Sequence, residues 1–174
     1  MFDFKEILPE KINDNIFSLI GKDWMLIGAS DGEKTNAMTA SWGGAGVLWN
    51  KNVVYAFIRP QRYTKEFVDK TDVFTLSFFD EAHRETLAYF GRVSGRDEDK
   101  IAKKGLNVNL IACDGAEGLA PVFDEARRTL VCRKLYNAPM VKEGFVDKSL
   151  IDKNYALGDF HMVYVGEIIK VLEK

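Results

Sequence analysis

Hydrophobic positions along this chain recur in short runs or in alternation with polar positions. Near the C-terminus, Met162 and Tyr164 alternate with Val163 and Val165, a period of two that is typical of a β-strand. Earlier runs are rich in β-branched and aromatic residues and end at turn residues, which also favours strands. The predicted strands cover residues 24–30, 36–42, 52–58, 73–79, 127–136 and 161–172.

Shorter segments between these strands have the composition of helices. Thr64 precedes a charged stretch that reaches Lys70, and its hydroxyl is expected to cap that helix. Gly105 is expected to end another helix. Residues 81–90, 97–104 and 147–155 complete the set of predicted helices. Mostly antiparallel strands with a few covering helices indicate a mainly β protein built as a small barrel.

Length and charge narrow the classes of protein that need to be considered. The chain has 174 residues and no repeat or long linker, so residues 1–174 are expected to form a single domain. The formal net charge is -2 and basic residues are dispersed, which argues against a nucleic-acid partner. No segment resembles a signal peptide or a membrane span. A cytoplasmic location is therefore the expectation.

Cysteine and histidine are too sparse to predict a metal centre. Cys113 and Cys132 are far apart, and His83 and His161 stand alone. Neither zinc-ligand spacing nor a redox dithiol motif is present. We expect two free thiols and no metal.

Polar and small residues fill the predicted strand at 36–42. The segment Asn36-Ala-Met-Thr-Ala-Ser-Trp42 contains few of the Val and Ile residues that strands favour. Small side chains let a flat ligand approach the backbone, while Asn36, Thr39 and Ser41 offer hydrogen-bonding groups to a polar ring edge. The alternative is a polar edge strand that ends in a turn at Gly43-Gly44.

Two further segments have the residue types that recognise a phosphate. Arg59-Pro-Gln-Arg-Tyr-Thr64 follows a hydrophobic strand and precedes the short helix, so two guanidinium groups and hydroxyls converge near a helix start. The alternative is a solvated loop. In Gly91-Arg-Val-Ser-Gly-Arg-Asp-Glu-Asp-Lys100 a Ser-Gly turn precedes a helix. Lys100 could add a charge to the same anion, or Asp97 could merely cap an ordinary helix.

Taken together, these segments resemble the flavin reductase-like family of FMN-binding split-barrel proteins, most closely its flavoredoxin-type branch. The resemblance covers most of the chain. It rests on the 36–42 strand, the 59–64 loop, Phe74-Thr-Leu-Ser-Phe78 and Ser94-Gly-Arg-Asp-Glu-Asp-Lys100. His161-Met-Val-Tyr-Val-Gly-Glu-Ile168 is similar to the closing strand of the family.

The resemblance implies an FMN-binding split β-barrel, mostly antiparallel, that forms a homodimer with FMN at the subunit interface. The flavin ring would lie against Met38 to Trp42, and the phosphate would meet Arg59, Arg62 and Thr64, with Lys100 nearby. His161 would either lie near the flavin or form a structural hydrogen bond. The expected cofactor-binding residues are Asn36, Met38, Thr39, Ala40, Ser41, Trp42, Arg59, Arg62, Tyr63, Thr64, Ser94, Lys100 and His161.

The same resemblance implies an oxidoreductase that takes electrons from NAD(P)H or a protein donor and passes them to free flavin or another acceptor. The flavin would supply the redox chemistry, so no catalytic acid or base is assigned. The chain has no GxGxxG dinucleotide fingerprint. The alternative is an FMN-binding electron-transfer or ligand-binding module without its own NAD(P)H turnover.

Overall fold

An open antiparallel sheet forms the body of the molecule. The computed structural model describes residues 3–174. The main sheet has the order β3-β2-β6-β9-β10-β5-β4, with β1 paired to β10, and the described strands pair antiparallel throughout. The strands are β1 Lys5–Ile7, β2 Met25–Ser30, β3 Thr35–Ala40, β4 Gly43–Leu48, β5 Lys51–Ile58, β6 Val73–Phe78, β9 Arg128–Pro139 and β10 Met162–Glu173. The predicted mainly β, mostly antiparallel split-barrel fold is confirmed.

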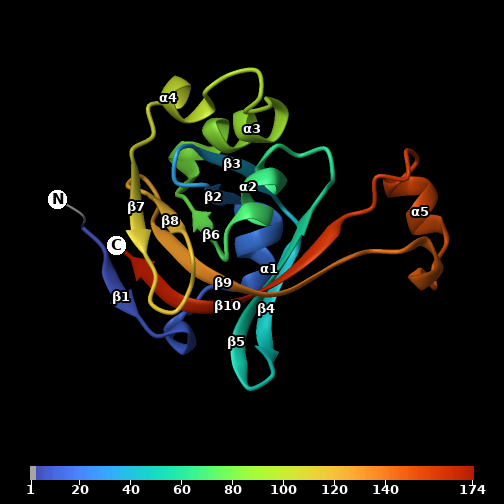
Figure 1. Cartoon of the computed structure of the whole chain (residues 1–174), viewed down its shortest axis with the longest axis horizontal. Helices are drawn as coiled ribbons and strands as arrows, with labels where there is room; N and C mark the ends of the chain where they lie inside the picture. The colour runs from blue at the N-terminus through green and yellow to red at the C-terminus, as the bar shows by residue number, and fades with distance from the viewer. Residues whose placement is uncertain (1–2) are drawn as a thin grey trace.

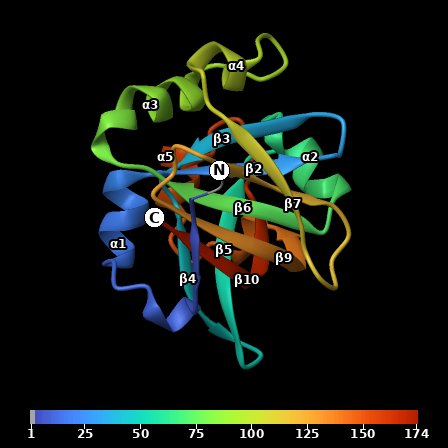
Figure 2. The same ribbon diagram turned by 90° about the vertical axis from the view of Figure 1, so that its left-hand side faces the viewer.

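Short helices cover the sheet rather than forming a layer of their own. Figures 1 and 2 show α3 and α4 above the edge strand β3, and Figure 1 shows α5 at the right, beyond the ends of β9 and β10. The helices are α1 Ile16–Ser18, α2 Thr64–Lys70, α3 Arg84–Arg92, α4 Lys100–Lys104 and α5 Ser149–Asn154. A π-helical turn Leu19–Asp23 follows α1, and 3-10 turns occupy Pro9–Lys11, Glu81–His83 and Lys142–Gly144. No helix within residues 3–174 is long and apolar enough to span a membrane.

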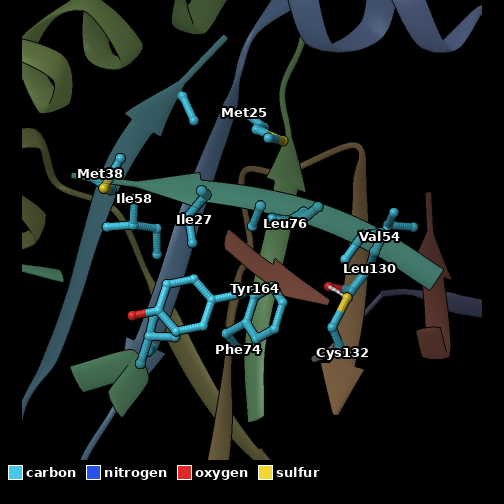
Figure 3. Close-up of a cluster of buried hydrophobic side chains, with 14 of the residues drawn as sticks. Met25, Ile27, Met38, Val54, Ile58, Phe74, Leu76, Leu130, Cys132 and Tyr164 are labelled. Atoms are coloured by element: carbon cyan, nitrogen blue, oxygen red, sulfur yellow. Dashed lines mark hydrogen bonds between the residues drawn. The ribbon is translucent and has the colours of Figure 1, made fainter. Parts of the chain in front are cut away.

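Although β3 contains several polar residues, its apolar side chains pack into the hydrophobic core on both faces of the sheet. Met38 and Ala40 belong to the main core cluster, and Figure 3 shows Met38 close to Ile58 and Ile27. Ala37, which points to the other face, joins a second cluster beneath α3. Alternate residues of a strand face opposite sides. β3 is therefore packed between the barrel core and the helical cover.

Three strand regions were not expected from the sequence, one of them the short β1 near the N-terminal end of the described residues. Gly43-Gly44 does not form a turn, because Gly43 begins β4, which pairs with β5. The actual turn is Trp49-Asn50, where both residues have positive φ angles of 53° and 56°, as a two-residue hairpin loop requires. A separate hairpin of β7 Val108–Ala112 and β8 Leu119–Phe123 is also new. β4 is rich in Gly and Ala and so lacks a strand signal of its own.

The predicted helix caps were partly wrong. Thr64 is the first residue of α2 and does not cap it, because its hydroxyl oxygen accepts a hydrogen bond from the amide of Asn36. α4 is shorter than predicted, and Asp99 rather than Asp97 caps it by accepting from Ile101 and Ala102. Gly105 ends α4 in the left-handed conformation, with φ 63°, as expected.

A long arm projects from the barrel. β9 and β10 continue beyond β6 and carry residues 140–161, the arm, which contains α5 and lies at the right of Figure 1. Tyr155, at the C-terminal end of α5, nevertheless packs against His161 at the base of the arm, with ring centroids 5.5 Å apart. The arm is thus anchored next to the barrel on the side of β5.

Candidate functional site

The predicted site residues line two adjoining pockets beside β3. The polar pocket, of about 190 Å³, and the aromatic pocket, of about 250 Å³, share Met38 and Arg62. Predicted residues in the polar pocket are Asn36, Met38, Arg62, Tyr63, Thr64, Ser94 and Lys100. Those in the aromatic pocket are Met38, Thr39, Ala40, Ser41, Trp42, Arg59, Arg62 and His161. Segments that are far apart in sequence therefore meet around one strand.

β3 offers backbone groups as well as side chains. It is the last strand of the sheet and pairs only with β2 among the described strands, so one row of its N–H and C=O groups lacks a strand partner. The Lys100 ammonium donates to a backbone carbonyl of β3, that of Ala37, at 2.7 Å. The Thr39 hydroxyl donates to the Leu87 carbonyl of α3. The remaining edge groups are available to a ligand with complementary polar atoms.

Arg62 and Lys100 contribute positive charge to the polar pocket, which Arg92 also lines. Lys100 is only 3% exposed and donates to the carbonyls of Ala37 and Phe90. Arg62 donates to the carbonyls of Gly91, at 2.9 Å, and Phe90. Burial and the nearby Arg62 cation lower the pKa of Lys100 to about 8, and burial lowers the pKa of Arg62. Within residues 3–174 neither cation forms an ion pair with a carboxylate.

Asn36 and Gly95 shape the wall of the polar pocket. The Asn36 amide donates to the Thr64 hydroxyl oxygen at 2.8 Å, and both residues are buried. A Cβ atom on Gly95 would lie in contact with the Asn36 side-chain oxygen and 3.1 Å from Cδ1 of Tyr63. Gly95 therefore has no room for a side chain while Asn36 keeps its present position.

Ser94 and Tyr63 have structural contacts at the pocket rim. The Ser94 hydroxyl oxygen accepts from the backbone N–H of Arg96 at 3.2 Å, and its carbonyl accepts from that of Asp97. The Tyr63 ring packs edge-on against Phe67, with the Arg96 guanidinium 4.8 Å from the Tyr63 centroid. These contacts order the Ser-Gly turn that leads to Lys100.

Arg59 shares the aromatic pocket with Arg62 but does not line the polar pocket. Its guanidinium forms an ion pair with Asp159 and donates to the Asn154 carbonyl at 2.9 Å. Gln61 donates to the same Asp159 carboxylate. Of the three residues expected at the phosphate, Arg62 and Thr64 therefore line the polar pocket, whereas a carboxylate in the arm holds Arg59 in the aromatic pocket. Their contact with a phosphate stays a prediction.

Aromatic rings surround His161. The His161 ring centroid lies 5.4 Å from Trp42 and 6.4 Å from Phe57. His161 is 6% exposed, and burial together with the Arg59 cation lowers its pKa to about 4, although Asp159 acts in the opposite direction. The imidazole is therefore neutral at pH 7. Trp42 is 48% exposed, so its ring is accessible to a ligand.

Several lining residues were missed by the sequence reasoning. Gly95 and Arg92 contribute to the polar pocket, and Phe57 contributes to the aromatic pocket. Gly95 stood in the Ser-Gly turn that was recognised, so its need for a small residue could have been suspected. Tyr155 and Asp159, which contact His161 and Arg59, gave no local signal.

A third pocket adjoins the aromatic pocket through Thr39 and Ser41. It has a volume of about 690 Å³ and lies between β3 and α3. Trp24 forms part of its wall, and the Arg84 guanidinium lies 3.4 Å from the Trp24 ring centroid. The lining is completed by Glu85, Leu87, Ala88, Gly91, Arg92 and Lys104.

The fold is that of the flavin reductase-like split barrels. The chain is a member of the flavin reductase like domain family, whose model matches residues 17–174. The predicted family is thus confirmed. None of the curated proteins compared with this sequence gives a significant match.

Solved structures share the fold at low sequence identity. An FMN-binding domain of a flavin reductase-like enzyme from Shewanella baltica OS155 has a TM-score of 0.68 and 15% identity over 98% of this chain and 77% of that chain. A flavoredoxin from Methanosarcina acetivorans has a TM-score of 0.66 and 23% identity, over 97% of this chain and 76% of that chain. An NADH:FAD oxidoreductase from Streptomyces globisporus has a TM-score of 0.60 and 13% identity, over 87% of this chain and 74% of that chain. The similarity shows a common fold.

Proposed function

We propose that this chain binds FMN non-covalently across the polar and aromatic pockets and acts as an oxidoreductase. The observation that carries the proposal is the pair of cations Arg62 and Lys100, which line one pocket without a carboxylate partner in residues 3–174. Lys100 is buried and Arg62 is half-buried, and cations removed from water are costly without an anion. A phosphate monoester would supply that anion.

The residues of the polar pocket fit a phosphate. Arg62 can form charge-assisted hydrogen bonds and Lys100 can contribute a compact positive charge. Each now donates to backbone carbonyls, which are neutral acceptors. Thr64 supplies a hydroxyl, and Gly95 keeps the backbone close. These donors line a pocket of about 190 Å³, which suits a single phosphate group.

The aromatic pocket fits a planar ring. Trp42 and His161 are the ring-bearing walls, and the edge of β3 offers backbone hydrogen-bonding groups. The side chains of Met38 and Ala40 lie in the core, so a ring beside these residues would meet mainly their backbone. When bound, FMN supplies the electron chemistry. The residues of this chain hold and orient it.

The third pocket is our candidate for the second reactant. It shares Thr39 and Ser41 with the aromatic pocket, so a molecule there would lie near the ring. Arg92 and Lys104 outnumber Glu85 among its charged lining residues, which favours an anion such as NADH or NADPH. The NADH:FAD oxidoreductase relative supports a nicotinamide donor. The flavoredoxin relative supports the alternative of an electron-transfer protein without its own turnover.

The proposal includes a homodimer with FMN at the subunit interface. The arm supports this proposal because it exposes apolar side chains that a partner subunit could cover. Exposed apolar residues in and beside the arm are Tyr136, Val141, Val146, Leu150 and Leu157. Sedimentation of the FMN-loaded protein is expected to give a dimer, and an FMN-loaded monomer would refute this part. The cytoplasmic location stays a prediction.

The decisive experiment is a visible absorption spectrum of the purified protein during titration with FMN. We expect saturable binding, with bleaching of the flavin bands under anaerobic NADH or NADPH. Bleaching and sustained turnover would support a reductase, whereas a bound flavin that neither nucleotide reduces would favour the electron-transfer alternative. If no FMN binds at pH 7, the proposal is wrong. Riboflavin, which lacks the phosphate, is the matched ligand and is expected to bind more weakly.

A further inference from the structure

Tyr155 makes a direct hydrogen bond to a histidine that lines the aromatic pocket. The Tyr155 hydroxyl oxygen lies 2.8 Å from Nδ1 of His161, and the two rings are nearly perpendicular, at 84°. Both residues are 6% exposed. His161 lines the aromatic pocket, but Tyr155 does not. Tyr155 therefore stands behind the histidine as seen from the pocket.

The direction of this hydrogen bond follows from the acceptors available to the hydroxyl. Burial raises the pKa of Tyr155, so the phenol keeps its proton at pH 7. The same hydroxyl also lies 3.7 Å from the Met140 sulfur. A thioether is a weak acceptor, whereas an unprotonated imidazole nitrogen is a good one. The Tyr155 proton therefore goes to Nδ1 of His161.

This direction fixes the position of the histidine proton. A neutral imidazole carries one proton, so an Nδ1 atom that accepts a hydrogen bond leaves the proton on Nε2. No hydrogen bond to Nε2 of His161 occurs within residues 3–174. Nε2 is thus the nitrogen that remains free to meet a ligand in the aromatic pocket.

We propose that Tyr155 is a positioning residue that holds His161 as its Nε2–H tautomer, so that the aromatic pocket presents one neutral N–H donor to an acceptor atom of its ligand. The ligand half of this inference rests on the proposed FMN function, because a flavin ring edge carries carbonyl oxygens and ring nitrogens. The tautomer half rests on the protein alone.

The charged groups around the pair support a neutral donor. Arg59 lies 5.2 Å from the Tyr155 ring centroid and opposes protonation of His161. Asp159 favours protonation, but it is paired with Arg59. The remaining rings that contact the pair are apolar or uncharged. A fixed N–H dipole is consequently what the pocket offers at physiological pH.

The connection also gives the arm a role in the site. Tyr155 follows α5, and its ring packs on Phe160 and Phe145, with centroids 4.9 and 5.6 Å away. Asn154 and Asp159 of the same segment hold Arg59. The segment that projects from the barrel in Figure 1 therefore orients two residues of the aromatic pocket.

Nuclear magnetic resonance can read the tautomer directly in the ligand-free protein. The chain contains only His83 and His161, so a His83→Gln background leaves one histidine to observe. In long-range ¹H–¹⁵N spectra at pH 7 we expect an unprotonated Nδ1 and a protonated Nε2. Tyr155→Phe should give a mixture of tautomers, while Tyr136→Phe, a change at an exposed tyrosine, should not. A protonated Nδ1 in the parent protein, or no change in Tyr155→Phe, overturns the proposal.

FMN titration tests the donor role separately. Addition of FMN should shift the Nε2 and Hε2 resonances of His161, and His161→Gln, which retains an N–H donor, should bind FMN better than His161→Leu. Loss of one neutral hydrogen bond corresponds to a roughly 2- to 10-fold difference in Kd. FMN binding without either effect overturns the donor role. Failure of FMN to bind overturns the proposed function, whereas the tautomer is still read in the ligand-free protein.

Discussion

Arg62 and Lys100 donate hydrogen bonds to the same atom, the carbonyl oxygen of Phe90, each at 3.3 Å. One carbonyl thus holds two cations close together at the end of α3. Their mutual repulsion contributes to the lowered pKa of Lys100. An anion bound between them would relieve that repulsion.

FMN affinity should depend on pH through Lys100. The pKa of Lys100 is lowered from its ordinary 10.5 to about 8 in the ligand-free protein. A bound phosphate favours the protonated amine and raises this pKa, so binding takes up a proton above pH 8. The Kd for FMN should therefore increase as pH rises from 8 to 9.5, by up to about tenfold per pH unit. Fluorescence titration at a series of pH values measures this.

Two controls test whether Lys100 and the phosphate cause the pH dependence of the Kd for FMN. Lys100→Met should abolish the dependence, because the titrating group is gone. Riboflavin has no phosphate, and its binding should be nearly independent of pH over the same window. An unchanged slope in Lys100→Met would show that another group titrates.

The ligand-free protein should become more stable as pH rises through the pKa of Lys100, whereas FMN binding becomes weaker. The unfolded chain keeps the Lys100 proton up to about pH 10.5, whereas the folded chain loses it near pH 8. Because the unfolded state binds more protons in this window, the free energy of unfolding should rise from pH 8 to 10.5 in the parent relative to Lys100→Met. Urea titrations of both proteins check this. A parent that loses stability relative to the variant would contradict the lowered pKa.

Gly95→Ala should disturb the polar pocket from within. The new methyl group would collide with the Asn36 side chain, which holds Thr64. We expect a loss of about 1–3 kcal/mol in the free energy of unfolding and a weaker affinity for FMN. Gly46→Ala is the matched control, since nothing lies within 4 Å of a Cβ there, and it should change stability by no more than about 0.5 kcal/mol. Equal effects of both changes would exclude a specific role for Gly95.

The strands could be predicted from sequence because their signal is local. β5, β6, β9 and β10 have runs or alternation of apolar and β-branched residues. β4 could not be predicted, because its Gly- and Ala-rich sequence becomes a strand only through pairing with β5. The β-propensity of the residues predicts a strand where the segment has its own apolar pattern. Elsewhere, pairing with neighbouring strands decides whether a segment becomes a strand.

The site was predicted as a set of residues, but not as a set of contacts. Arg59 and Arg62 are the same residue type three positions apart and share the aromatic pocket, yet only Arg62 also lines the polar pocket, while Asp159, 100 residues later, pairs with Arg59. Lys100 is held in the site by the carbonyls of Ala37 and Phe90, 63 and 10 residues earlier. None of these partners leaves a mark in the local sequence.

The hydrogen bond between Asn36 and Thr64 gives a further test of the polar pocket. Thr64→Val keeps the shape of the side chain but removes the acceptor for the buried Asn36 amide. A buried donor that loses its partner costs about 1–3 kcal/mol, so thermal denaturation should show a lower Tm than for Thr64→Ser, which retains a hydroxyl. An equal Tm for the two variants would show that the bond contributes little.

Arg92 and Lys104 should affect the second reactant more than FMN. Both line the third pocket, and Lys104 lies 4.5 Å from the Tyr89 ring centroid without an ion pair within residues 3–174. If NADH or NADPH binds there, Lys104→Ala should raise KM for the nucleotide several-fold, because a charge-assisted contact is lost, while the Kd for FMN stays unchanged. Arg92 also lines the polar pocket, so Arg92→Ala should weaken both. Lys103→Ala is the control, because Lys103 is a neighbouring cation that does not line the pocket and pairs with Glu98. Equal KM values for the Lys103 and Lys104 variants would show that the nucleotide does not bind in the third pocket.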